Sequence, residues 1–366
     1  MIRHALLGGL AALATAAAAL AAPLSPGDLR LIGALEIPKT LVVDGASFGG
    51  VSGIDYDPTT DEWLMISDDK SDLAPARFYV GRLEFDAKTV SGLHLQRVVS
   101  LRREDGSTFP SAREPSGERA DAESIRIDPV DGSLLWSTEG DPQRRFDPAI
   151  RRMDRQGNPL GAVALPDMFS FRRGARRNQT LEGLSFSADG RTLWAAMEGP
   201  LIQDGPVSTV AQAGVVRLTR LDRQGRIQAQ YAYRLDPVQA APARRGDNGI
   251  SEILAVDERQ LLILERSGVE DAQGRFIFHC RIYVVDVSGA LDVSGEESLA
   301  NGDIRPLTKR LLVNFDRLPD VAAANLEAMA WGPVVGKRRS LVLMADDNFD
   351  PTQKGQVVVF TLAARS

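Results

Sequence analysis

The chain has 366 residues, with 49 acidic and 43 basic side chains, so its formal net charge is −6 at pH 7. This negative balance argues against nucleic acid as a partner, because a polyanion attracts a protein through clustered positive charge. Cys280 is the only cysteine. An intramolecular disulfide is therefore excluded, and stability must come from burial of a hydrophobic core.

Residues 1–21 have the pattern of a secretory signal peptide. Arg3 precedes an apolar run from Ala5 to Ala22, and the residues before the expected cleavage point, after Ala21, fit the small-x-small rule. An uncleaved anchor is the alternative, since a run of this length can just span a bilayer. The run is mostly alanine and therefore weakly hydrophobic. We expect a signal peptide at 1–21, a domain at 22–366, export to the periplasm or the extracellular space, and no membrane span after cleavage.

Five segments share one pattern, in which two apolar runs flank a turn and an acid stands near each outer end, except that the first segment has Ser52 at its first position. In the clearest copy, residues 180–199, Glu182 opens the first run, Asp189-Gly190 forms the turn and Glu198 follows the second run. An Asp-Gly pair between apolar runs is typical of a β-hairpin, whose two outer ends lie at the same edge of the sheet. The paired positions are Ser52 with Asp68 or Asp69, Glu123 with Glu139, Glu182 with Glu198, Glu252 with Glu265, and Glu327 with Asp346 or Asp347.

Further strand-like runs follow each hairpin, two after each of the first four and one, at 356–362, after the fifth. Another run, at 29–37, precedes the first hairpin. Four-stranded units that recur along a chain are typical of a β-propeller. We predict an all-β fold, a single β-propeller of five four-stranded blades, with the N-terminal strand completing the last blade and closing the ring. Six blades are the alternative, and they require one more blade than the sequence contains.

The propeller places the acids of the five hairpins together at one end of the central channel. Like charges raise one another's pKa, so these carboxylates need a divalent cation, bridging arginines or retained protons. We prefer calcium, which takes hard oxygen ligands, because His94 and His279 are too few for zinc or copper. The alternative is that the acids only cap strand ends or pair with arginines. The expected ligands are Asp68, Glu123, Glu182, Glu252, Glu327 and Asp346.

Arginines gather in the connections that lead into the hairpins. Arg176 and Arg177 precede Glu182, and Arg245 precedes Glu252. Guanidinium groups above a carboxylate-bound cation suit a phosphate or another anionic ester, so we expect these three arginines to bind the substrate. The alternative is that they are solvated loop charges paired with surface acids.

Several segments resemble the phytase-like family, described as "esterase-like activity of phytase", of exported bacterial proteins. They are NQTLEGLSFSADGRTLWAAMEG, DAESIRIDP, EAMAWGP and MADDNF, and the resemblance runs from about Gly33 to the C-terminus. The family name implies ester hydrolysis. A looser likeness to gluconolactonases and paraoxonases implies a cation at the channel mouth, held here by the matching Glu123, Glu182, Glu252 and Glu327. Ser52 departs from a fully symmetric ring of acids.

Two functions from different classes follow. The first is a metal-assisted hydrolase of a phosphoric or carboxylic ester, a calcium-dependent esterase or phosphatase acting on a small anionic ester. In it, Glu182 and Glu252 are the expected catalytic pair that activates water. The second is a non-catalytic periplasmic binding or scaffold propeller with a protein partner, in which the acids are structural. A propeller fold by itself is compatible with both.

Overall fold

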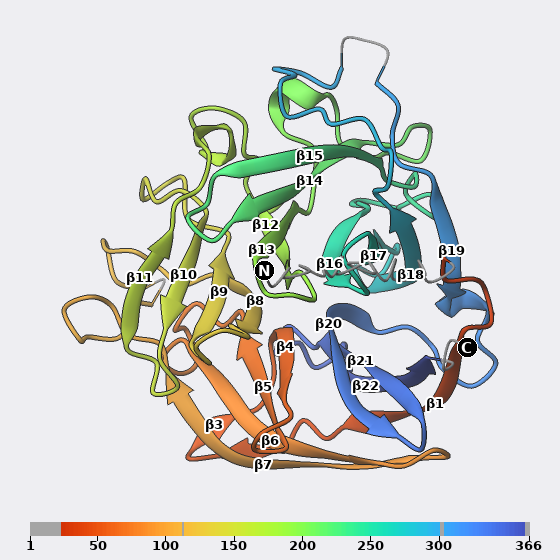
Figure 1. The fold of residues 1–366 in the computed structure, drawn as a ribbon. Coiled ribbons are helices and arrows are strands. Elements are labelled where there is room, and N and C mark those ends of the chain that lie inside the picture. Colours follow the sequence, from red (N-terminus) through yellow and green to blue (C-terminus); the bar gives the residue numbers. More distant parts are fainter. Residues whose placement is uncertain (1–22, 112, 301–303, 363–366) are drawn as a thin grey trace, which may run out of the picture.

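A computed structural model describes residues 23–111, 113–300 and 304–362 of the chain. Five four-stranded antiparallel sheets form a ring around a central channel (Figure 1). The first blade contains β4 (Val51–Asp57), β5 (Glu62–Ser67), β6 (Arg77–Phe85) and β7 (Val90–Ser100). The second contains β8 (Ala122–Ile127), β9 (Leu134–Thr138), β10 (Ala149–Met153) and β11 (Pro159–Val163).

The third blade contains β12 (Leu181–Phe186), β13 (Thr192–Met197), β14 (Val215–Asp222) and β15 (Ile227–Arg234). The fourth contains β16 (Gly249–Ala255), β17 (Gln260–Glu270), β18 (Phe276–Asp286) and β19 (Lys309–Asn314). The fifth contains β20 (Asn325–Val335), β21 (Arg338–Asp346), β22 (Gly355–Leu362) and β1 (Leu29–Ile37). The connections hold the short strands β2 (Val42–Val43) and β3 (Ala46–Ser47), and three single turns of 3₁₀ helix, η1 (Asp167–Phe169), η2 (Ile202–Asp204) and η3 (Phe315–Arg317).

The N-terminal strand closes the ring. β1 pairs antiparallel with β22, from Leu29 opposite Leu362 to Ile37 opposite Gly355. The fifth blade is thus built from both ends of the described chain, coloured red and blue in Figure 1. This arrangement confirms the predicted five-bladed propeller and its closure, and it leaves no sixth blade in the described residues.

Apolar side chains fill the spaces between neighbouring blades. Trp194 and Tyr233 of the third blade, for example, pack in one cluster with Ile250 and Ile263 of the fourth. The second strand of each blade is buried on both faces, so its sequence is a nearly continuous apolar run rather than an alternating one, as in β13 and β21. The expected signal peptide at 1–21 lies outside the described residues. Among the residues that the structure covers, no helix is both long enough and apolar enough to cross a membrane.

The five inner strands β4, β8, β12, β16 and β20 approach one another closely around the channel. At Gly53 on β4, an added Cβ would lie 2.7 Å from the carbonyl oxygen of Glu123 and 2.7 Å from the Cα of Ser124, both backbone atoms of β8. We expect Gly53→Ala to lower the free energy of unfolding by about 1–3 kcal/mol, because neither backbone can yield without disturbing its own sheet. Gly295→Ala is the matched control, since its Cβ would meet no atom within 4 Å. Urea unfolding of both variants checks this, and equal stability would contradict it.

Candidate functional site

One end of the channel opens into an acidic cavity of about 380 Å³. Its lining includes three basic side chains, Lys70, Arg245 and Arg266. The carboxylates that line it are Asp68, Asp121, Glu123, Glu139, Glu182, Glu198, Asp247, Glu327 and Asp346. Acids thus outnumber bases by six in this cavity, and the predicted gathering of acids at one end of the channel is present in the structure.

Side chains at this end of the channel form two circles, one from the inner strands and one from the second strands. An irregularity in each inner strand positions the first circle. The pairing of every inner strand with the second strand of its blade slips near the start, between Val51 and Gly53 in β4 and between Leu181 and Gly183 in β12. Such a β-bulge leaves one residue unpaired and re-aims its side chain, and bulges are frequent beside active sites. The residues at the five slips are Ser52, Glu123, Glu182, Ser251 and Glu327.

The second circle lies at the ends of the second strands. The backbone amides of Asp68, Glu139 and Glu198 each donate to a carbonyl just ahead of the inner strand of the same blade. Arg266 lies opposite Gly249, and Asp346 lies opposite Asn325, in the equivalent places of the fourth and fifth blades. The five positions are therefore Asp68, Glu139, Glu198, Arg266 and Asp346.

The neighbouring acids Asp69 and Asp347 have structural partners. Asp69 forms a buried ion pair with Arg77 at 2.6 Å. Asp347 accepts from the Gly50 amide at 3.1 Å and pairs with Lys39 at 3.0 Å. Of each Asp-Asp pair in the sequence, the first member lines the cavity.

The structure does not bring Glu252 into the cavity. Ser251 occupies the bulge of β16, so Glu252 lies one residue further along the strand, where the side chain takes another direction. Its carboxylate is fully buried in the channel, 2.5 Å from Arg126, and accepts hydrogen bonds from Ser124 Oγ at 3.2 Å and the Leu184 amide at 3.1 Å. Glu252 is expected to be a metal ligand and a catalytic residue, but its side chain does not line the cavity in which either role would be carried out.

Glu265 is displaced in the same way. It accepts from Tyr233 and Asn248 and pairs with Lys309 at 2.5 Å, outside the cavity. Arg266 takes its place in the second circle and lies 2.9 Å from Glu198 and 3.7 Å from Glu327. The fourth blade thus contributes a serine and an arginine to the two circles, where the hairpin pattern in the sequence predicts two glutamates.

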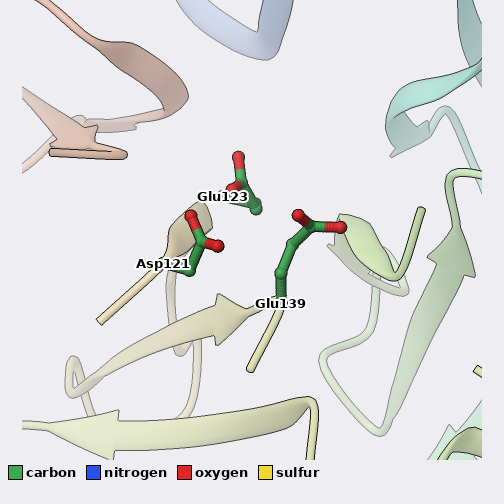
Figure 2. Close-up of side chains that lie close together, drawn as sticks. All are labelled: Asp121, Glu123 and Glu139. Carbon is green, nitrogen blue, oxygen red and sulfur yellow. The ribbon is translucent and has the colours of Figure 1, made fainter. Parts of the chain in front are cut away.

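Two groups of three carboxylates converge within the cavity. Asp121, Glu123 and Glu139 place one oxygen each within 4.8 Å of one another, and Glu139, Glu182 and Glu198 do the same. Figure 2 shows the first group, with Asp121 and Glu123 from the start of the second blade and Glu139 from the end of its β9 strand. Glu139 belongs to both groups.

Burial and mutual repulsion raise the pKa of these carboxyls. Loss of hydration is the largest cause, and it raises the pKa of Glu139 to about 7, with the Asp121 carboxylate adding to the rise. For Glu123, Glu182 and Glu198, burial likewise raises the pKa well above its ordinary value, and for Glu182 the charges of Glu123 and Glu198 raise it further. The cluster therefore favours either protons or a bound cation.

The basic side chains relieve only part of this charge. Lys70 pairs with Asp121 at 2.5 Å, and this attraction outweighs burial and raises the pKa of the lysine. The carboxylates of Glu327 and Glu198 similarly outweigh burial and raise the pKa of Arg266. Both side chains are consequently cationic.

The three arginines predicted to bind substrate lie in different places. Arg245 lines the cavity and pairs with Glu270 at 2.7 Å. Arg177 lines a small hollow that adjoins the cavity and shares Lys70 with it. Arg176 donates to two backbone carbonyls, those of Pro200 and Gly205, each at 2.9 Å, and so holds its own loop.

Several residues that line the cavity are not among those that the sequence predicts for the site. Asp121 could have been found, because it stands two residues before Glu123 and side chains at i and i+2 share a face of a strand. Glu139 and Glu198 belong to the sequence pattern, as the second acids of their hairpins, but are not among the six expected ligands. Lys70 and Asp247 carry no signal in the sequence that separates them from other loop charges.

Solved structures with a similar arrangement are distant in sequence. A thermostable family-43 glycoside hydrolase has a TM-score of 0.45 at 8% identity, over 86% of this chain and 89% of that one. A family-43 β-1,3-galactosidase has a TM-score of 0.44 at 13% identity, over 89% of this chain and 60% of that one. The catalytic domain of a Coprinopsis cinerea family-62 α-L-arabinofuranosidase has a TM-score of 0.36 at 11% identity, over 86% and 93%. Likeness at this level says nothing about activity.

No curated protein matches the sequence. The sequence profile of one family does match, that of the phytase-like family described as esterase-like activity of phytase, over residues 46–349. This range contains all five hairpins and every carboxylate that lines the acidic cavity. The chain belongs to the phytase-like family.

Proposed function

We propose that this protein is an exported, metal-assisted hydrolase of phosphoric or carboxylic esters, and that the acidic cavity is its active site. One observation carries the proposal. Two groups of three carboxylates share Glu139 in a cavity where acids outnumber bases by six. Buried charge of one sign at this density is unfavourable in a purely structural role, and perturbed carboxyls in a cleft are typical of functional sites.

The donor set fits calcium. Among the described residues that line the cavity, the candidate ligands are carboxylate and amide oxygens, with no histidine and no cysteine. Asn325 adds a second observation, because its side chain is buried in the lining and its Oδ1 has no hydrogen-bond partner. Asp121, Glu123, Glu139, Glu182 and Glu198 would hold the cation. A bound divalent cation polarises an ester oxygen and lowers the pKa of water.

The chain's own residues supply the other functions of the site. Glu182 is the candidate general base, since one oxygen of its carboxylate can face the cation while the other accepts a proton from an attacking water. Arg266 and Lys70 lie on the cavity wall as cations and can hold the negative oxygens of the ester. Arg245 is the one predicted substrate-binding arginine with the position for the same task.

A non-catalytic binding or scaffold propeller with a protein partner is the second candidate. The observation in its favour is Arg266, which reaches both Glu198 and Glu327 and so offsets carboxylate charge without any cation. In that case, calcium would have no effect on stability, and no ester would be hydrolysed.

Glu182→Gln tests the proposed function. We expect wild-type protein to hydrolyse members of a panel of phosphoric and carboxylic esters in calcium and to lose that activity in EDTA. The variant should lose about 10²–10⁴-fold in kcat, the usual contribution of a general base. Glu84→Gln is the matched control, an equal charge change at an exposed site whose partner is His94. If Glu182→Gln retains full activity, Glu182 is not the base, and if wild-type protein hydrolyses no ester, the scaffold function is favoured.

A further inference from the structure

A second cavity, of about 370 Å³, adjoins the acidic cavity. Four residues line both, namely Phe276, Phe278, Asn325 and Gln353. We call the part lined by Phe276, Phe278 and Ala322–Ala324 the apolar annex. No sequence pattern indicates it, because the residues that line it lie far apart along the chain.

A long hairpin of the fourth blade builds the aromatic wall. The pairing of β16 with β17 stops at Gly249 opposite Arg266, whereas β17 and β18 stay paired as far as Glu270 opposite Phe276. The hairpin therefore continues past the inner strand, at the end of the blade where the acidic cavity lies. Phe276 and Phe278 share one face of β18, with ring centroids 6.1 Å apart and planes 18° apart. Ile277, between them, points to the other face and is 51% exposed.

Charged groups mark the boundary between annex and acidic cavity. The Arg245 guanidinium lies 5.2 Å from the centre of the Phe276 ring, and Glu270 holds it at 2.7 Å. Three consecutive alanines, Ala322–Ala324, also line the second cavity. The rest of its lining is polar, and Lys354 and Glu36 in it form an exposed ion pair. The second cavity thus combines an aromatic and alanine part with a polar rim, whereas the acidic cavity beside it is lined mainly by charged groups.

We propose that the annex binds the apolar group of an amphipathic ester whose polar ester group lies in the acidic cavity. This inference rests on the proposed function and names its substrate class. The two phenylalanine rings offer apolar contact area, and an aryl group gains more of it than a small alkyl group does. The pairing of a hard-oxygen site with an aromatic wall predicts that substrates such as sugar phosphates, which lack an apolar group, bind weakly.

Equilibrium binding of uncleavable probes tests the inference without requiring turnover. The probes are phenylphosphonate against methylphosphonate, and benzoate against acetate, each titrated calorimetrically into the calcium-loaded full chain. We expect wild-type protein to bind the aryl member of at least one pair about tenfold or more tightly than the methyl member. Phe276→Ala and Phe278→Ala should reduce this ratio to near one. Ile277→Ala, on the outer face of the same strand, should leave it unchanged.

The outcomes separate the inference from the proposed function. Aryl and methyl probes that bind equally well would overturn the annex and leave the ester site standing. A preference for aryl probes that survives both phenylalanine variants would also overturn it. If none of the four probes binds, the ester site itself is contradicted and the annex with it. Circular dichroism and thermal midpoints like those of wild type establish that each variant is folded, and the single substitutions at 276 and 278 provide two independent trials.

Discussion

Arg126→Met is expected to lower the free energy of unfolding by about 3–5 kcal/mol at pH 8, because it leaves a buried carboxylate without its partner. Arg126 is 3% exposed and lies on β8, yet it reaches all four other inner strands. It donates to the carbonyls of Ile54 on β4, Leu184 on β12 and Met329 on β20, and it pairs with Glu252 on β16. This one guanidinium ties the inner strands together and fills the channel below the cavity.

The loss should depend on pH in a defined direction. Burial raises the pKa of Glu252 from 4.5 to about 7, although Arg126 lowers it. A raised carboxyl pKa means that the folded chain holds the proton longer than the unfolded chain, so this group's contribution to stability falls as pH rises from about 4.5 to about 7. In the folded chain Glu252 is largely neutral below about pH 7, so at pH 5 loss of the arginine leaves no bare charge. The destabilisation by Arg126→Met should therefore be smaller at pH 5 than at pH 8.

Glu252→Gln in the Arg126→Met background is the matched control, since it removes the orphaned charge while keeping the shape. The double variant should recover a large part of the stability at pH 8 and little at pH 5. Urea unfolding at the two pH values measures all of these changes. A loss below about 1 kcal/mol for Arg126→Met, or a loss of the same size at both pH values, would show that the pair does not stabilise the ring in this way.

Glu139→Gln is expected to weaken calcium binding by about 100-fold or more, because Glu139 is the carboxylate common to both groups. Replacing an outer-shell partner of a metal typically costs about 10–100-fold in affinity, and a shared ligand should cost at least as much. The Thr180 backbone amide donates a hydrogen bond of 2.8 Å to the Glu139 side chain. Glutamine keeps a side-chain oxygen that can accept the same bond. Calcium titration by calorimetry measures the effect.

The same substitution should stabilise the protein in EDTA, since it removes one of several like charges from a buried cluster. A loss of stability in EDTA together with unchanged calcium affinity would contradict both expectations. Glu84→Gln, which changes the same charge at an exposed position, should alter neither quantity.

Much of the fold could be predicted because it depends on patterns that repeat. The turn at Asp189-Gly190 and the apolar runs on either side of it define a hairpin, and four similar hairpins define the blades. A lone strand at 29–37 and a missing strand at the other end predict the closure that the pairing of β1 with β22 confirms. These features are local and strongly patterned.

The fourth blade shows why the site was harder to predict. In GISEILA, the sequence pattern makes Glu252 the equivalent of Glu182, but the neighbouring Ser251 occupies the bulge. Apolar neighbours are buried whether Ser251 or Glu252 occupies the bulge, because the inner strand is covered on both faces. The hydrophobic pattern therefore cannot choose between the two placements. A shift of one residue reverses the side-chain direction, and it moves Glu252 into the channel and Arg266 into the cavity.

Thermal unfolding of the protein in EDTA and then in calcium tests the central claim most directly, that the acidic cavity holds a cation. A ligand that binds only the folded state raises the free energy of unfolding by about 2.7 kcal/mol at about 100 times its Kd. We predict a midpoint that rises with calcium concentration in wild-type protein and in Glu84→Gln, and a rise in Glu139→Gln that needs about 100-fold more calcium or more. A midpoint unaffected by calcium, magnesium and manganese would contradict the claim and favour a scaffold whose acids are held by Arg266 and Lys70.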